Sequence, residues 1–285
     1  MGTSASSNGP VGGVPFDPPW LDEITIPIPE DISQPEDSAP TDDSRENQPI
    51  PLMTPPPQPK VAPSRRFSNA RRALGEFVHT GQRDFFRKAV GHYSRTGMGG
   101  ASNAARRMRT STRSGASAFN FLQSVRDRTS PEVNEWVKSL IERNASPQEI
   151  ADEIIRRITP AGGSQDETAC RESMTEAIGD LLYNYPDVDL LHLGDGEIWT
   201  LIESFLCYEV SQRLYLDIGQ IFENSSLSVR DRVTRLNEMR DYLKAEIHSQ
   251  IMKLRQETPN LGADQLQKIM QNTLKNTFAV YEGEI

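Results

Sequence analysis

The chain has few cysteines and lacks any long apolar run. It contains two cysteines in 285 residues, and no stretch approaches 18 consecutive apolar residues. Cys170 and Cys207 lie far apart without a CxxC spacing, which argues against a zinc knuckle, a redox pair and a disulfide scaffold; we expect two buried thiols. The N-terminus also lacks the basic start and apolar stretch of a secretory signal. These absences predict a cytoplasmic protein with no metal site and no membrane contact.

Proline and charge are distributed unevenly along the chain. Residues 1–63 hold 15 of the 20 prolines and carry a net charge of −8. Residues 64–115 hold no proline and carry +10, whereas residues 116–285 carry −11. We therefore expect an acidic Pro-rich tail, a basic helical segment with a glycine hinge, and an acidic helical bundle. Because the tail and the basic segment have opposite charges, a contact between them must be weighed against any external partner.

The tail has too few apolar residues to build a core. Phe16 and Trp20 are its only aromatic residues, so we expect residues 1–63 to be mostly disordered with a polyproline II bias. Trp20 begins an apolar patch suited to docking on a partner as an extended strand, and this patch continues with Leu21, Ile24, Ile26 and Ile28. A solvated linker is the favoured interpretation of these residues, and docking is the alternative.

The segment 116–285 shows the periodicity and punctuation of helices. Ser130-Pro131 and the capping box Ser146-Pro147-Gln148-Glu149 mark two helix starts. Further helices are expected from Ser164, from Asp195 to about Phe222, from Ser228, and from about Ala263 to Val280. The helix from Asp195 is apolar on nearly every side, which is typical of a central buried helix.

The helix from Ser228 is expected to be long and amphipathic. Its predicted inward face consists of Val229, Val233, Leu236, Leu243, Ile247, Ile251 and Leu254. Outside the proline-bearing tail, no segment alternates apolar and polar residues as a strand would. The sequence therefore predicts an all-α protein with a C-terminal helical bundle.

Residues 64–115 combine two short amphipathic helices with a glycine-rich break. Ser68 is expected to cap the first helix, whose Leu74, Phe77 and Val78 face inward. The apolar face of the second consists of Phe85, Phe86, Ala89, Val90 and Tyr93. Gly97, Gly99 and Gly100 then precede a basic helix start at 104–108. Such a start suits phosphate binding, but there is no GxxxxGK[ST] pattern and no preceding strand, so a hinge is favoured.

The twelve cationic side chains of this segment suit nucleic acid, an acidic partner or the acidic tail. Phosphates supply non-specific affinity, and exposed aromatic rings stack on bases. The phenylalanines, however, fall at helical spacing, which favours a role in the core. Nucleic-acid binding through residues 64–115 is therefore the alternative function and not the favoured one.

No constellation of residues indicates catalysis. His79, His92, His192 and His248 show no metal-ligand spacing and no Ser or Cys elbow beside them. Asp195 and Glu197 are typical of a helix start, where they favour capping and the first-turn charge. We expect a protein that is not an enzyme and that has no cofactor of its own.

Three features together resemble a known family: the start MGTSASSNGP, the Pro-rich acidic tail, and the motif AVGHYSRTGMGGASNAARRM. This pattern, over roughly residues 1–115, is similar to the QatB family of bacterial Qat anti-phage systems. The helical remainder is compatible with that family without being diagnostic. In these systems QatB stands beside an ATPase, a QueC-like enzyme called QatC, and a TatD-like nuclease.

The resemblance implies that the chain is a protein substrate. The QueC-like partner would join a 7-deazaguanine, through an amide, to Gly2 after Met1 is removed. This covalent adduct on Gly2 is the only cofactor-like group expected. Partners are expected to dock at Arg106, Arg107, Tyr93 and Trp20.

The residues at the N-terminus suit this chemistry, but they also fit a lipidation motif. The amine of Gly2 has an ordinary pKa of about 7.7 to 8.0, so part of it is neutral and nucleophilic near neutral pH. Met1-Gly2 with Ser6 also satisfies the myristoylation pattern. Bacteria ordinarily lack that acylation, and the acidic tail provides no polybasic second anchor. Modification with deazaguanine is therefore favoured over a fatty acyl group.

Overall fold

The computed structural model of the protein describes residues 62–159, 165–257 and 263–285. The described residues are helical and contain no strand, which confirms the predicted all-α class. The predictions for residues 1–61, including disorder, Gly2 and Trp20, lie outside the described part. The helices are α1 (Ser68–Thr80), α2 (Arg83–His92), a π-helical turn η2 (Tyr93–Gly97), α3 (Ala101–Arg107), α4 (Arg109–Asp127), α5 (Pro131–Glu142), α6 (Pro147–Ile158), α7 (Gln165–Asn184), α8 (Asp195–Ile218), α9 (Gln220–Glu223), α10 (Val229–Glu257) and α11 (Ala263–Glu282).

Two helix starts follow the expected capping chemistry. Ser130 precedes α5, and its Oγ accepts a hydrogen bond from the backbone N–H of Val133 at 3.1 Å. At α6 the Ser146 Oγ accepts from the N–H of Glu149 at 3.3 Å, while the Glu149 carboxylate accepts from the N–H of Ser146 at 2.7 Å. This is the predicted capping box, which satisfies backbone donors that have no partner within a helix.

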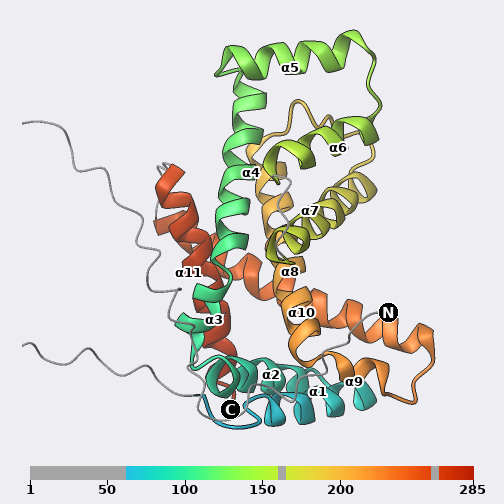
Figure 1. The fold of residues 1–285 in the computed structure, drawn as a ribbon, viewed down its shortest axis with the longest axis vertical. Coiled ribbons are helices and arrows are strands. Elements are labelled where there is room, and N and C mark those ends of the chain that lie inside the picture. Colours follow the sequence, from blue (N-terminus) through green and yellow to red (C-terminus); the bar gives the residue numbers. More distant parts are fainter. Residues whose placement is uncertain (1–61, 160–164, 258–262) are drawn as a thin grey trace, which may run out of the picture.

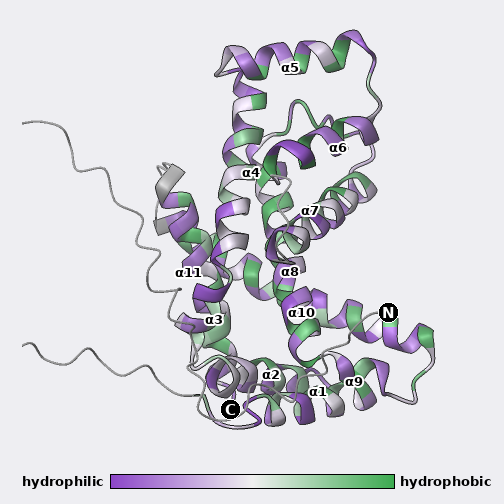
Figure 2. Ribbon diagram, in the orientation of Figure 1, coloured by the Kyte–Doolittle hydropathy of each residue, from purple (hydrophilic) through white to green (hydrophobic). Residues whose placement is uncertain are grey.

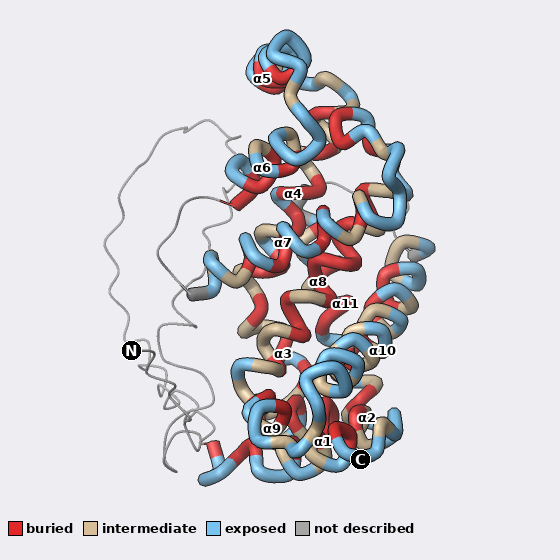
Figure 3. The backbone as a smooth tube through the Cα atoms, turned by 90° about the vertical axis from the view of Figure 1, so that its right-hand side faces the viewer, coloured by how far each residue is buried: buried red, intermediate tan, exposed pale blue. Residues whose placement is uncertain are grey.

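The core is centred on α8. Its buried residues face every direction and include Ile198, Leu201, Phe205, Leu206, Val210 and Leu214. Helices α4, α7 and α10 pack against it, and α11 lies along α3 and α4 (Figure 1). Figure 3 shows α8 buried over most of its length, whereas α7 and α10 have one exposed side. The sequence prediction of a central buried helix from Asp195 is confirmed.

Helix α4 was not expected from the sequence. Its first half reads RTSTRSGASA, in which small and polar residues conceal the apolar period. A Cβ atom added at Gly115 would lie 2.9 Å from Met270 Sδ and 3.2 Å from Phe205 Cε1, so the small residue permits close packing against α11 and α8. The expected boundary between residues 115 and 116 falls within this helix, and one hydrophobic cluster extends from Phe67 to Tyr281.

The basic segment packs through its aromatic residues onto the C-terminal helices. Phe77 and Phe86 are fully buried, and their ring centroids lie 5.4 Å apart. The Phe86 ring also contacts Tyr242 of α10 and Tyr281 of α11, at 5.7 Å and 6.0 Å. Gly91 of α2 lies so close to α11 that an added Cβ would stand 2.4 Å from the backbone oxygen of Tyr281. The segment is therefore part of the main core.

Several sequence predictions about these helices need correction. Ser68 is the first residue of α1 and makes no capping hydrogen bond; Phe67 precedes it. Phe85 is only partly buried. Val229 and Val233, predicted to face inward, are 68% and 49% exposed, because the first half of α10 extends beyond the body of the molecule (Figure 1). Figure 2 shows hydrophilic and hydrophobic residues together on this part of α10.

No helix within the described ranges has both the length and the apolar character needed to cross a bilayer.

Candidate functional site

Three arginine side chains gather where η2, α3, α8 and the turn before α1 meet. Arg66 precedes α1, Arg107 ends α3, and Arg213 lies on α8. Tyr93 of η2 and Asp217 of α8 complete the group, and we call these five residues the arginine cluster. Residues more than 100 positions apart in the sequence are thus brought together by the packing of η2 and α3 beside α8.

Asp217 holds the cluster together. Its Oδ2 accepts a hydrogen bond from the Tyr93 hydroxyl at 2.8 Å and lies 3.5 Å from Arg213 Nε. Its backbone oxygen accepts a hydrogen bond from Arg71 Nη2 at 3.0 Å. Burial, together with the Asp217 carboxylate, raises the pKa of Tyr93 well above its ordinary value, so the hydroxyl remains a neutral donor.

Two of the three guanidinium groups have lowered pKa values. Burial, followed by the charge of Arg107, lowers the pKa of Arg66. Burial, followed by the charge of Arg213, lowers the pKa of Arg107. Arg66 is only 9% exposed, and its guanidinium lies 4.8 Å from the Phe67 ring centroid. Arg213 differs: burial lowers its pKa, but Tyr93, Asp217 and Asp166 outweigh burial and raise it. The three guanidinium groups thus lie near two carboxylates, those of Asp217 and Asp166, and could hold a further oxyanion through charge-assisted hydrogen bonds.

A small pocket of about 60 Å³ adjoins the cluster. Arg107, Arg213 and Gln212 contribute to its wall, and so do the carboxyl groups of Asp166 and Glu209. Asp166 Oδ1 lies 3.5 Å from Arg213 Nη1. Glu209 is 6% exposed, accepts hydrogen bonds from Ser111 and from the Cys170 thiol, and has a pKa raised by burial. This shift favours the neutral form of the carboxyl group.

The residues expected to dock partners lie in different environments in the structure. Arg106 and Arg107 lie on the last turn of α3 and are partly exposed. Tyr93 is 1% exposed, so its ring belongs to the core and positions Asp217 for the arginines. Trp20 and Gly2 lie outside the described residues. Arg213 and Asp217 were missed, because nothing in the sequence of α8 sets them apart from other charges on a buried helix.

The aromatic residues of the basic segment offer little to nucleic acid. Phe77, Phe86 and Tyr93 are buried, and Phe67 stacks on Tyr93 with ring centroids 5.6 Å apart. Base stacking requires exposed rings, so these buried rings do not support the alternative function, which is nucleic-acid binding.

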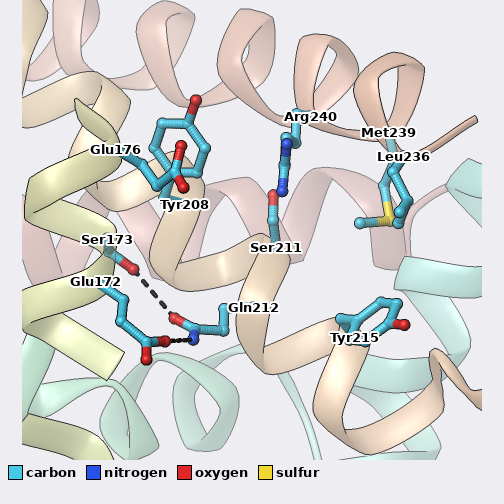
Figure 4. Close-up of a pocket in the computed structure, with 10 residues that line it drawn as sticks. All are labelled: Glu172, Ser173, Glu176, Tyr208, Ser211, Gln212, Tyr215, Leu236, Met239 and Arg240. Carbon is cyan, nitrogen blue, oxygen red and sulfur yellow. Dashed lines mark hydrogen bonds between the residues drawn. The ribbon is translucent and has the colours of Figure 1, made fainter. Parts of the chain in front are cut away.

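A larger pocket of about 220 Å³ lies between α7, α8 and α10 (Figure 4). On one side Gln212 accepts a hydrogen bond from Ser173 at 3.2 Å and donates one to Glu172 at 2.8 Å. On the other side the Arg240 guanidinium lies 5.2 Å from the ring centroid of Tyr208. The polar groups of this pocket thus largely pair with one another. Within its lining, no nucleophile lies beside a general base.

The reactive side chains outside these pockets are satisfied or buried. Burial raises the pKa of Cys170 and of Cys207 to about 12, which keeps both thiols protonated near neutral pH. His248 Nδ1 lies 2.7 Å from Glu203 Oε2, and His192 Nδ1 lies 2.6 Å from Asp189 Oδ2. Among the described residues, no group of three or more His, Cys, Asp or Glu side chains is arranged to hold a metal ion.

Comparison with known protein families identifies a relationship for this chain. Residues 99–281, more than half of the chain, match the family described as "QatB: Qat anti-phage system associated protein QatB". This match lies mainly in the helical region and overlaps the motif-bearing part of the sequence only at residues 99–115. No curated protein and no solved structure matches the chain. The chain therefore belongs to the QatB family and is a component of a Qat anti-phage system that works with other Qat components.

Proposed function

We propose that this protein is a substrate that carries a modified N-terminus for its Qat system. After removal of Met1, the α-amine of Gly2 would form an amide with the activated carboxyl group of a 7-deazaguanine. A QueC-like partner would catalyse the reaction in the cytoplasm, where new chains lose Met1. The ATPase and the TatD-like nuclease of the system are the further proposed partners.

The observation that carries this proposal is family membership combined with the sequence of the N-terminus. Gly2 is followed by Thr3, Ser4 and Ala5, so the first residues are small enough to enter a narrow enzyme pocket. The α-amine has an ordinary pKa of about 7.7 to 8.0, which leaves a neutral fraction able to attack an acyl group at neutral pH. The residues up to the described body give this amine a long tether.

The described helices support a role as a carrier that is not itself an enzyme. The two thiols are buried and protonated, and His192 and His248 each interact with a carboxylate. A nucleophile requires an adjacent base and an accessible position, and these side chains do not combine both features. We therefore assign the chemistry to the partner enzyme.

The proposal is tested by changing the attacking amine in cells that carry the complete Qat system. Gly2→Pro replaces the primary amine by a hindered secondary amine, and we expect the adduct and protection against phage to be lost. Gly12→Pro is the matched control, because it makes the same exchange within the tail and leaves the terminal amine unchanged. Circular dichroism of both purified variants should equal that of the wild type. Full protection by Gly2→Pro would contradict the proposal.

A further inference from the structure

We propose that the arginine cluster binds an acidic segment of the chain's own N-terminal tail, residues 30–46. The contact would consist of carboxylates of this segment on the guanidinium groups of Arg66, Arg107 and Arg213. Residues 30–46 lie outside the described part of the protein, so the argument rests on the cluster, on the charge of the segment and on the tether between them.

The burial and hydrogen bonding of the cluster favour an oxyanion as its ligand. Arg66 is 9% exposed, and its Nε has no hydrogen-bond partner among the described residues. Asp217 is shared between Tyr93 and Arg213, and Asp166 lies at the edge of the pocket, 3.5 Å from Arg213. A buried cation without full compensation is costly, and a carboxylate relieves that cost through charge-assisted hydrogen bonds. Guanidinium groups also bind planar carboxylates better than lysines do.

The segment 30–46 has the matching chemistry. It contains seven acidic residues and one arginine: Glu30, Asp31, Glu36, Asp37, Asp42, Asp43 and Glu46, with Arg45. Its acids come mostly in pairs, so that two carboxylates reach neighbouring guanidinium groups at once. The rest of the tail is less acidic, with Asp17, Asp22 and Glu23 before this segment and Lys60 after it. Charge complementarity therefore selects residues 30–46 over other parts of the tail.

The tether holds this segment near the cluster. The described chain begins at Ala62, which is 3% exposed and stands four residues before Arg66. The 16 steps from Glu46 to Ala62 include six prolines, which favour a semi-rigid spacer that spans up to about 50 Å. The 17-residue acidic segment itself is long enough to turn back along this spacer, and the contact is intramolecular, so that several individually weak contacts act together.

Docking at residues 30–46 leaves the first 29 residues beyond the contact. Fully extended, these residues span about 95 Å. This consequence rests on the proposed function: Gly2 would still reach a partner enzyme, while the base of its tether is held at α3 and α8. The docking experiment below does not involve Gly2, so its failure and the failure of the proposed function are distinguishable.

The contact is measured in the full chain with two spin labels and dipolar electron paramagnetic resonance. Labels are attached to Ser38→Cys in the tail and to Ser102→Cys, an exposed position on α3. Cys170 and Cys207 are buried and have raised pKa values, so they do not compete for the label. We expect a narrow distance distribution at low salt and a broad one at high salt, because the contact is electrostatic.

Two matched tail variants identify the segment without disturbing the fold. Neutralising Asp37, Asp42 and Asp43 to asparagine should convert more than half of the narrow population to the broad one. Removing three charges at Asp17, Asp22 and Glu23 should leave the distribution unchanged. Arg66→Gln should also broaden it, with the thermal unfolding temperature recorded to confirm that the body remains folded.

Three results would overturn the inference. The first is a broad distribution in the wild-type chain at low salt. The second is an equal effect of the two tail variants, which would place the contact outside residues 30–46. The third is duplex DNA binding that is lost in Arg66→Gln but unaffected by neutralising Asp37, Asp42 and Asp43, since the cluster would then serve nucleic acid.

Discussion

At Glu209 a carboxyl group lies among Ser111, Cys170 and the apolar residues of α8, with only 6% of the residue exposed. Burial raises its pKa above the ordinary value. In the unfolded chain the group loses its proton at lower pH than in the folded protein. Stability is therefore lost as the pH rises from the unfolded pKa through the folded pKa, and the penalty is complete at higher pH.

We predict that Glu209→Gln raises the unfolding temperature by a few degrees at neutral pH. The amide keeps an oxygen for the Ser111 hydroxyl but carries no charge to bury. The difference from wild type should shrink as the pH falls below about 4.3, the ordinary pKa of glutamate, where both proteins are neutral at this position. Thermal unfolding followed by circular dichroism across pH checks this, and a lower unfolding temperature at neutral pH would contradict it.

Glu149 provides the control of opposite sign. The N–H of Ser146 donates to its carboxylate and lowers its pKa, so its contribution is present above the unfolded pKa and lost as the pH falls through the folded one. Glu149→Gln should lower the unfolding temperature at neutral pH, and the difference should vanish in acid. If both variants shift in the same direction at neutral pH, burial does not decide the behaviour of Glu209.

Asp217 is the residue on which the arginine cluster depends. Asp217→Asn keeps an acceptor for the Tyr93 hydroxyl but removes the negative charge beside Arg213. We predict a loss of about 1–3 kcal/mol in the free energy of unfolding, because the cluster loses one of the two carboxylates beside Arg213. Tyr93→Phe removes one hydrogen bond and should cost less, about 0.5–1.5 kcal/mol. Urea denaturation measures both, and a larger loss in Tyr93→Phe would contradict this account.

At the scale of the elements, the contact between α2 and α11 leaves no space for a side chain at Gly91. A Cβ there would meet the backbone oxygen of Tyr281 at 2.4 Å, so the two helices must separate. We predict that Gly91→Ala costs about 1–3 kcal/mol in the free energy of unfolding. Gly179→Ala is the control: nothing lies within 4 Å of a Cβ at this position in α7, so alanine should stabilise the helix by about 0.5–1 kcal/mol. Equal effects of the two changes would show that close packing does not limit Gly91.

Helix α10 has an exposed first part and a later part that is buried against the core. Leu243 is fully buried against the core, whereas Val233 is 49% exposed. Leu243→Ala should therefore cost about 2–5 kcal/mol, and Val233→Ala should change stability by no more than about 0.5 kcal/mol. Urea denaturation checks the pair. A large loss in Val233→Ala would restore the inward position that the sequence predicted.

The sequence predicted most helices because their caps and apolar periods are local signals, as at Ser130 and Ser146. It missed α4 because small residues such as Gly115 pack closely without producing an apolar stripe. It placed Val229 and Val233 inside because apolar periodicity shows which residues share one face of a helix. It does not show whether another element covers that face. Arg213 and Asp217 were missed for a similar reason, since only tertiary packing brings them to Arg66 and Arg107.

At the scale of the whole molecule, one hydrophobic cluster joins residues from Phe67 to Tyr281. The charge segments at 64–115 and 116–285 therefore share a core, in which α4 continues across their boundary. We predict a single cooperative unfolding transition, with circular dichroism and tryptophan fluorescence, to which the buried Trp136 and Trp199 contribute, changing together. An earlier separate transition in either signal would indicate that the basic segment unfolds independently.

The central claim is that the helical body carries an N-terminus that a partner modifies. The most direct measurement is the intact mass of the full chain, purified from cells with and without the QueC-like partner. The account predicts loss of Met1 in both samples and a deazaguanine-sized increase only with the partner, located on Gly2 by fragmentation of the N-terminal peptide. Identical masses in the two samples, or a fatty acyl increase on Gly2, would contradict it.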